Sequence, residues 1–305
     1  LYCVPKSMTR PIIFAIDKNY IQHLAVALES LFKNNDFIIN VYVLFDGLNK
    51  NDIYNLDIIA KRYQQSITYH KVNIERFSGF KENFHFTKAM YFRLLIPDIL
   101  DADVQSAIYI DSDVVINGNI KYLFELDLED NKLAAVGNPD FSAIERLKLK
   151  INTIYFDSGL LVFNLDIWRK ENIHKKIIKY IKNNPEKLLY PDNDALNIII
   201  DGDFLEISPR FSLQSNYIDC KICDFTYFEK FESLQEIFQN PVVIQYAGSS
   251  KPWHYLSNDH YRKLYWKYLK DTPYKNFTFE DKTLKNVIKK YMLNPFKKII
   301  EIIKP

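Results

Sequence analysis

The stretch YIDSDVVI, residues 109–116, places two aspartates one residue apart directly after an apolar run. In an extended chain residues i and i+2 point to the same side, so Asp111 and Asp113 should converge while Ser112 points away. Two carboxylates fixed at the end of a strand suit a hard divalent cation such as Mg²⁺ or Mn²⁺, which keeps positions open for phosphate oxygens. The stretch therefore predicts a metal site. Capping of a strand or helix end is the alternative.

Apolar runs on both sides of this stretch predict a sheet. The expected strands cover residues 11–16, 41–45, 66–72, 107–110, 133–136, 160–165 and 241–246. Apolar residues recur at helical spacing over residues 21–32, 53–63 and 173–181. Strands that alternate with helices indicate an α/β fold with a mainly parallel sheet covered on both faces. Ligands of such sheets lie at the carboxyl ends of the strands, where Asp111 and Asp113 are expected.

Composition narrows the possible functions. The chain has 305 residues, enough for one large α/β domain, and a net charge of only +2, which does not suggest a nucleic-acid-binding protein. Neither an apolar run of membrane-spanning length nor a signal sequence is apparent, so we expect a cytoplasmic protein. Its seven glycines form no GxGxxG or GxxxxGK[ST] loop. A bound nucleotide would therefore need a metal ion and basic side chains to neutralise its diphosphate.

The three cysteines, Cys3, Cys220 and Cys223, are interpreted as incidental. A small odd number argues against a disulfide framework and for a reducing compartment. Cys220 and Cys223 form an isolated CxxC, whereas a zinc site would need a second pair or nearby histidines.

The pattern divides the chain into an N-terminal extension (1–10), one domain (11–270) and a basic amphipathic tail (271–305). Residues 285–305 contain six lysines and one acid, interleaved with apolar residues and interrupted by Pro295. Such a segment can lie on an anionic membrane surface, which would place the protein at the inner face of the cell membrane. Packing of one helix face against the domain is the alternative.

Six motifs, in one order between about residues 12 and 256, together resemble those of glycosyltransferase family 8, the retaining bacterial enzymes that build lipopolysaccharide cores. They are FAIDKNY (14–20), KAMYFRLLIPDIL (88–100), YIDSDVVI (109–116), YFDSGLLVFNLDIWR (155–169), YPDNDALN (190–197) and VIQYAGSSKPWH (243–254). The resemblance implies a GT-A fold with a Rossmann-like sheet, a Mn²⁺ or Mg²⁺ ion, a UDP-sugar donor, and a glycan or glycolipid acceptor.

The resemblance also implies which residues bind the donor. They are Asp17, Asn19, Arg93, Asp111, Ser112, Asp113, Asn138, Gly248 and Lys251. Asp17 and Asn19 would contact uridine and ribose, with a turn or helix cap as the alternative. Arg93 would contact the sugar or phosphates, with a surface ion pair as the alternative. Lys251 would bind the diphosphate through its charge, and Gly248 through close approach of its backbone.

Catalytic roles are implied for Asp192, Asn193 and Asp157. Asn193 stands at the motif position proposed for a protein nucleophile, but an amide is a poor nucleophile. Attack by the acceptor from the face that the leaving group vacates is therefore favoured, with Asp192, or Asp194 beside it, positioning sugar hydroxyls. Capping of a helix that begins near Ala195 is the alternative for both acids.

Three residues depart from the family pattern. Gln245 replaces the histidine that completes the metal site with Asp111 and Asp113, and its amide oxygen would hold Mn²⁺ more weakly than imidazole does. Asp157 replaces an asparagine, and Asn138 stands where relatives often have an acid.

The expected function is transfer of galactose or glucose from a UDP-sugar to lipopolysaccharide core or another surface glycan, with retention of configuration. Gln245 motivates one alternative, a catalytically weak or inactive homologue that binds UDP-sugars or glycans. A phosphatase of the haloacid dehalogenase type is another, in which Asp111 would accept phosphate and Asp113 would act as the acid. That class places its DxD strand near the N-terminus, whereas about 110 residues precede it here.

Overall fold

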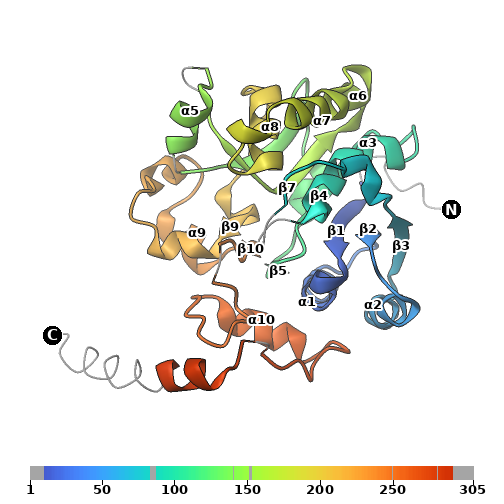
Figure 1. The fold of residues 1–305 in the computed structure, drawn as a ribbon, viewed down its shortest axis with the longest axis vertical. Coiled ribbons are helices and arrows are strands. Elements are labelled where there is room, and N and C mark those ends of the chain that lie inside the picture. Colours follow the sequence, from blue (N-terminus) through green and yellow to red (C-terminus); the bar gives the residue numbers. More distant parts are fainter. Residues whose placement is uncertain are drawn as a thin grey trace.

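The computed structural model describes residues 10–82, 87–139, 141–150, 153–248, 250–279 and 281–290. Its main sheet has seven strands in the order β3-β2-β1-β4-β7-β6-β8 (Figure 1). These strands are β1 (Ile12–Asp17), β2 (Asn40–Asp46), β3 (Ser66–Lys71), β4 (Ser106–Ile110), β6 (Leu133–Gly137), β7 (Phe156–Asn164) and β8 (Leu205–Glu206). Pairing is parallel except that β7 runs antiparallel to both β4 and β6. The predicted mainly parallel sheet is confirmed.

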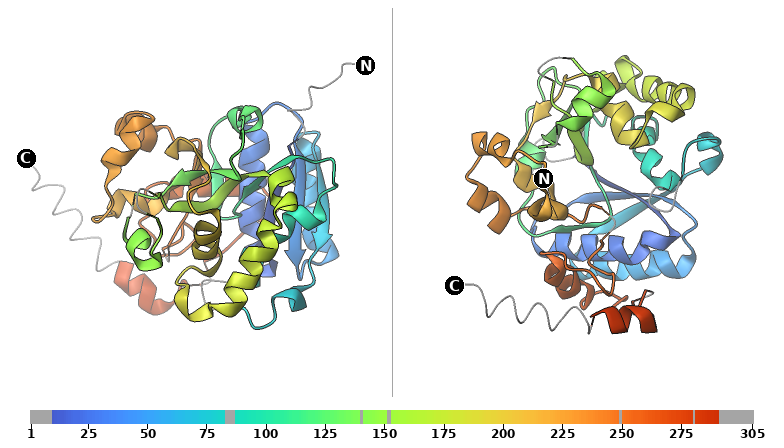
Figure 2. Two further views of the ribbon diagram at one scale, coloured as in Figure 1. Left: turned by 90° about the horizontal axis from the view of Figure 1, so that it is seen from above. Right: turned by 60° about the vertical axis from the view of Figure 1, so that its left-hand side comes forward.

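Helices cover both faces of this sheet (Figure 2). One face carries α1 (Ile21–Lys33) and α2 (Lys50–Arg62), and the other carries α6 (Leu165–Lys170), α7 (Ile173–Asn183) and α8 (Pro191–Ile200). The sequence sets the start of α2, because the Asn49 and Asp52 side chains form a reciprocal capping box.

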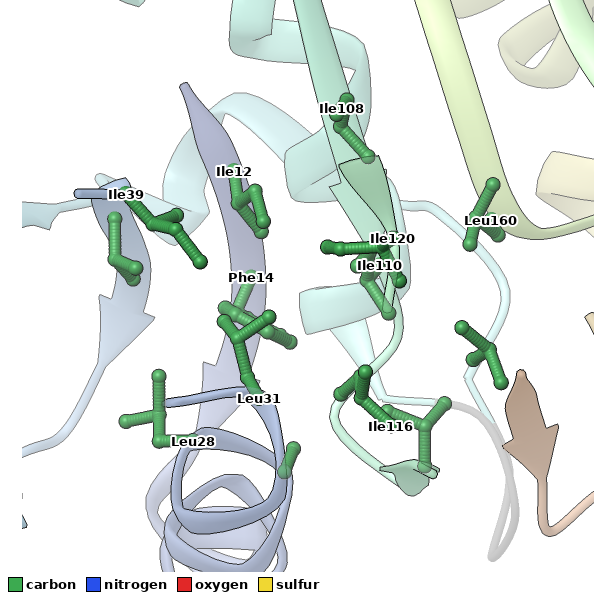
Figure 3. Packing of buried hydrophobic residues seen from close by; sticks show 14 of the residues in the cluster. Ile12, Phe14, Leu28, Leu31, Ile39, Ile108, Ile110, Ile116, Ile120 and Leu160 are labelled. Atoms are coloured by element: carbon green, nitrogen blue, oxygen red, sulfur yellow. The ribbon is translucent and has the colours of Figure 1, made fainter. Parts of the chain in front are cut away.

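Alternate residues of each strand enter different apolar layers. In β1, Phe14 packs towards α1 and α2 while Ile13 joins the layer on the other face. Figure 3 shows Phe14, Leu31 of α1 and Ile110 of β4 gathered in the first of these layers. Because Tyr109 lies in the opposite layer, the aspartate two residues after it leaves β4 on the face away from α1.

The remaining helical elements are short. They are η2 (Lys18–Tyr20), η3 (Ile74–Phe77), η4 (Lys88–Leu95), α3 (Ile96–Ile99), α4 (Lys121–Glu125), α5 (Ser142–Leu147), η5 (Pro185–Lys187), η6 (Pro209–Phe211), η7 (Ser215–Asp219), η8 (Phe225–Lys230), α9 (Leu234–Gln239) and α10 (Arg262–Leu269). A second sheet has the order β5-β10-β9, formed by β5 (Val114–Ile116), β10 (Val243–Gln245) and β9 (Leu213–Gln214). The predicted strand 241–246 therefore belongs to this sheet rather than to the main one.

Strand order explains why distant motifs meet. Strand β1 lies between β2 and β4, so the crevice at the carboxyl ends of β1 and β4 is a topological switch point, the usual ligand site of such sheets. The reversed β7 brings its beginning to the same place, where the Asp111 N–H donates to the Gly159 carbonyl at 2.8 Å. Strand β10 pairs antiparallel with β5, which places Gln245 opposite Val114, directly after the two aspartates.

Two local predictions need correction. The helix expected near Ala195 begins at Pro191, because proline is well suited to the first turn of a helix. The cysteines are not all incidental, since Cys220 and Cys223 form a disulfide across a tight turn with their Cα atoms 5.8 Å apart.

Helix α10 and the residues that follow it pack beside α1. Helix α10 contributes Tyr265, whose hydroxyl lies 2.8 Å from His23 Nδ1 of α1, and Asp271 forms an ion pair with Lys33. Residues 1–9 and 291–305 lie outside the described residues, and with them nearly all of the N-terminal extension and the last 15 residues of the basic tail. The division of the chain at residues 10 and 270 stays a prediction. Across the described ranges, every helix is too short or too polar to span a membrane.

Candidate functional site

Asp111 is the centre of the site. Its carboxylate oxygen Oδ1 accepts hydrogen bonds from Arg93 Nη2 at 2.8 Å and from the Tyr109 hydroxyl at 2.7 Å, and Oδ2 accepts one from Gln245 Nε2 at 2.9 Å. Burial raises the pKa of Asp111, the Arg93 guanidinium opposes this rise, and repulsion from Asp113 adds to it. The carboxylate thus lies where additional positive charge is stabilised.

Asp113 is paired with Lys251, which is 138 positions away in the chain. The Lys251 Nζ donates to Asp113 Oδ2 and to the Tyr246 carbonyl, both at 2.6 Å. The Tyr246 N–H in turn donates to the Asp113 carbonyl at 2.9 Å, which ties the end of β10 to the turn between the aspartates. Asp113 and Lys251, which the family resemblance assigns to the same donor site, are therefore in direct contact.

Gln245 contacts Asp111 and packs closely against Gly159. A methyl group at Gly159 would come within 2.2 Å of both amide atoms of Gln245, so a side chain at position 159 would displace the amide. While Nε2 donates to Asp111, the buried Oε1 has no hydrogen-bond partner among the described residues. An amide that turns about its last bond would direct this oxygen to the same side as the carboxylates.

These oxygens fit a hard divalent cation. Among the described residues no three His, Cys, Asp or Glu side chains form a cluster suited to a metal. If Asp111 and Asp113 hold a metal ion, Gln245 would supply the third ligand, because its amide oxygen has no hydrogen-bond partner among the described residues and its amide nitrogen already contacts Asp111. Carboxylate and amide oxygens are donors that Mg²⁺ and Mn²⁺ accept.

Arg93 joins the DxD motif to α8. Its side chain is 4% exposed, its Nε lies 3.4 Å from Asp192 Oδ2, and the guanidinium covers the Tyr109 ring at 4.3 Å. It also donates to the carbonyls of Met90 and Ser158. Burial lowers the pKa of Arg93, but the nearby carboxylates, Asp111 foremost, raise it by more than burial lowers it. The net shift of the pKa is therefore upward. The predicted alternative of a surface ion pair is wrong, because this arginine is buried.

Asp157 lies on the same rim at the start of β7 and is 4% exposed. It accepts hydrogen bonds from Asn138 Nδ2 at 2.8 Å and from the Tyr217 hydroxyl at 2.7 Å. The two departures at positions 138 and 157 are therefore in direct contact. Together they place one carboxylate, of Asp157, and one amide, of Asn138, at the start of β7.

Asp17 and Asn19 lie at the carboxyl end of β1. Asp17 Oδ1 accepts from the Asn19 N–H at 2.7 Å, so the predicted cap exists and begins η2. Burial raises the pKa of Tyr20, and the carboxylates of Asp113, Asp17 and Asp111 add to the rise. Strand β1 pairs with β4, so the end of β1 lies beside Asp111 and Asp113, in agreement with their effect on the pKa of Tyr20.

The other predicted residues differ in position. Gly248 has φ +80°, which favours glycine, and a Cβ added there would lie 3.7 Å from Asn216 Nδ2. Ser112 is buried, as expected of the residue between two inward aspartates. Asn193 accepts from Asn197 Nδ2 through its carbonyl, at 2.9 Å, in the first turns of α8. Trp253 is core, since its ring stacks on His23 with centroids 3.5 Å apart.

Asp194 stabilises the fold at the start of α8, because all of its partners belong to the protein. It is fully buried, forms a two-pronged ion pair with Arg146, and accepts from the Tyr155 hydroxyl at 2.8 Å. It also accepts from the N–H groups of Leu189 and Tyr190 and so caps α8, as the alternative for this residue predicted.

Sequence reasoning missed two tyrosines. Tyr109 shares the strand face of Asp111, and its position two residues earlier was a usable signal. Tyr217 lies 60 positions from Asp157, and no local pattern links the two.

Comparison with known proteins agrees with this geometry. The family model for glycosyl transferase family 8 matches residues 11–257. General stress protein A of Bacillus subtilis is 31% identical over 270 residues, covering 86% of this chain and 93% of the relative. A lipopolysaccharide 1,3-galactosyltransferase of Salmonella typhimurium is 27% identical over 253 residues, covering 80% and 72%.

Solved structures show the same fold. The galactosyltransferase LgtC, crystallised with donor and acceptor sugar analogues, superimposes with a TM-score of 0.77 and 25% identity. The match covers 86% of this chain and 96% of LgtC. The GT-A fold expected from the sequence is therefore confirmed. The chain belongs to glycosyltransferase family 8, and it is a glycosyltransferase.

Proposed function

We propose that this protein transfers a hexose, glucose or galactose, from a UDP-sugar to a glycan acceptor with retention of configuration. The observation that carries the proposal is the meeting of Asp111, Asp113, Lys251 and Arg93 at the carboxyl ends of β1 and β4. A metal-binding carboxylate pair beside two cations matches the charge pattern of a nucleoside diphosphate. Similarity to lipopolysaccharide galactosyl- and glucosyltransferases supports a hexose donor and a surface-glycan acceptor such as lipopolysaccharide core.

In this proposal Asp111, Asp113 and the amide oxygen of Gln245 hold the divalent ion. When bound, Mn²⁺ or Mg²⁺ neutralises the diphosphate and stabilises the charge that develops as it leaves. Lys251 supplies a second positive charge for the leaving group, and Asp17 and Asn19 contact the nucleoside. Similar stabilisation by fixed charges usually makes the largest contribution to such reactions.

The bond between the anomeric carbon and the diphosphate oxygen breaks, and its electron pair departs with UDP. The acceptor hydroxyl oxygen bonds to the anomeric carbon from the face that UDP leaves, and its proton passes to the departing phosphate oxygen. Asp192, fixed by Arg93, and Asp157, fixed by Asn138 and Tyr217, orient sugar hydroxyls. Asn193 stays outside the covalent chemistry because an amide is a poor nucleophile.

Release of UDP from a panel of UDP-sugars tests this function. The purified protein should release UDP from UDP-glucose or UDP-galactose with Mn²⁺ or Mg²⁺ and lose this activity with EDTA. NMR of a transfer product should show the anomeric configuration of the donor. A protein that neither releases nor binds UDP would contradict the proposal.

A second candidate, a binding protein without turnover, is favoured by the presence of an amide at Gln245. The same experiment separates the two, since a binding protein would take up UDP-sugar without releasing UDP. The phosphatase alternative is not favoured, because the family match spans the DxD motif and most of the sheet. Location on the cytoplasmic side, and membrane contact through the tail, stay predictions.

A further inference from the structure

Lys251 lies where a bound cation would compete with it. Its ammonium is 2.6 Å from Asp113 Oδ2 and 2.6 Å from the Tyr246 carbonyl, and its side chain is 15% exposed. Asp113 is one of the two carboxylates proposed to hold the metal. In the protein without ligands, part of that metal site is therefore neutralised by a side chain of the protein itself.

The two cations of the site differ in their freedom to move. Arg93 is anchored by the carbonyls of Met90 and Ser158 and packs over Tyr109, so it stays beside Asp111. Lys251 lies at the end of a flexible four-carbon stem. Its Nζ bonds are to one carboxylate and one carbonyl, and a diphosphate can replace both.

We propose that Lys251 acts as an exchangeable counter-ion of Asp113, which it releases when a nucleotide diphosphate arrives. This inference rests on the proposed function. Without nucleotide, a divalent ion at Asp113 would lie beside the ammonium, and repulsion between the two would weaken its binding. With nucleotide, Lys251 turns to the diphosphate and Asp113 becomes free for the metal. Metal and UDP should therefore strengthen each other's binding.

Thermodynamic linkage requires this effect to be reciprocal. If UDP tightens Mn²⁺ binding by some factor, Mn²⁺ tightens UDP binding by the same factor, and such couplings are commonly about 5- to 150-fold. Direct charge attraction between metal and diphosphate contributes to the coupling in any such site. The contribution particular to Lys251 is the weakness of Mn²⁺ binding in the absence of UDP.

The test compares wild type with Lys251→Met for Mn²⁺ binding, measured by electron paramagnetic resonance of the free ion, and for UDP binding, measured by calorimetry. In Lys251→Met, Mn²⁺ alone should bind about 5- to 10-fold tighter than in wild type, because the competing charge is gone. UDP should bind more weakly to the same variant. The two ligands thus respond in opposite directions, which a general loss of structure would not produce.

Two further variants serve as controls. Lys263→Met on α10 removes the same charge outside the site, and both of its affinities should match those of wild type. Lys251→Gln should behave as Lys251→Met does, which covers the case in which the methionine variant folds poorly.

Equal Mn²⁺ affinity of wild type and both Lys251 variants without UDP would overturn the inference and leave the proposed function intact. Absence of both Mn²⁺ and UDP binding in the wild type would instead overturn the proposed function. Tighter Mn²⁺ binding in Lys263→Met equal to that in Lys251→Met would also overturn the inference, since net charge alone would then explain the effect.

Discussion

Two aspartate pairs of this molecule have the same D-x-D spacing but different surroundings. The first pair is Asp111 and Asp113, after β4, and the second is Asp192 and Asp194, in the first turns of α8. Asp111 is 22% exposed at its side chain, and Asp113 is bound by a lysine on a flexible stem. Asp194 has no exposed side-chain surface and receives five hydrogen bonds, two of them from Arg146. Asp192 lies between these extremes, buried beside Arg93.

The difference shows that the D-x-D spacing alone does not define a ligand site. A carboxylate whose partners can be exchanged is available to a ligand, whereas one that caps a helix and closes an ion pair stabilises the fold. The comparison predicts that substitution of Asp113, whose lysine partner can be exchanged, reduces activity and leaves stability intact. Substitution of Asp194 should do the reverse.

Asp113→Asn should have the largest effect. The substitution keeps the shape of the side chain but removes the charge proposed to hold the metal and diphosphate. Sugar transfer should fall about 10³-fold, as expected when a preorganised charge is lost. The midpoint of urea unfolding should stay at the wild-type value. Wild-type turnover in this variant would refute the role of the first pair.

Asp194→Ala should chiefly destabilise the protein. Removing this carboxylate leaves the N–H groups of Leu189 and Tyr190 unpaired and Arg146 without its partner, at an expected cost of about 3–5 kcal/mol. Urea unfolding measures the loss. Arg146→Met, which removes the more exposed partner, should cost less. A stable Asp194→Ala variant without activity would move Asp194 into the reacting site.

Gly159→Ala should have an intermediate effect. The added methyl group would collide with the Gln245 amide, which in turn contacts Asp111. Activity with Mn²⁺ should fall about 10- to 100-fold, the range found for residues that position metal ligands. Gly118→Ala is the matched control, because its added methyl group would make only ordinary contact with Val242, 3.4 Å away. Equal activity of both variants would show that the position of Gln245 does not matter.

Gln245→His should have the smallest effect, and it is a gain. Imidazole binds Mn²⁺ more strongly than an amide oxygen does, so Mn²⁺ affinity measured in the presence of UDP should rise, by about tenfold. Mg²⁺ affinity should change less, since Mg²⁺ prefers oxygen ligands. Unchanged Mn²⁺ affinity would place Gln245 outside the metal site.

The sequence predicted the layers of the fold because its apolar periods are long and regular. It also predicted convergence of Asp111 and Asp113, since residues two apart share a strand face. It did not predict the reversal of β7, whose apolar run reads the same in either direction. The second sheet was missed for a similar reason, because three residues of β10 carry no signal of their partner.

Within the site, contacts between residues far apart in the chain could not be predicted from local sequence patterns. The family resemblance implied that Lys251 binds the diphosphate, but neither it nor any local pattern predicted the pairing of Lys251 with Asp113. Helix capping by Asp194 was an alternative that the YPDNDALN motif offered, whereas its ion pair with Arg146, 48 positions away, could not be read from that motif. The Cys220–Cys223 disulfide was missed because the cysteines were interpreted from their small, odd number alone. That number does not reveal that these two lie close enough to pair.

Calorimetric titration of UDP into the wild-type protein, with Mn²⁺ and then with excess EDTA, tests the central claim most directly. The claim is that the end of β4 binds a nucleoside diphosphate through carboxylates, a divalent ion and Lys251. Binding should be saturable with Mn²⁺ and at least about tenfold weaker with EDTA. The same UDP affinity under both conditions, or no UDP binding in either, would contradict it.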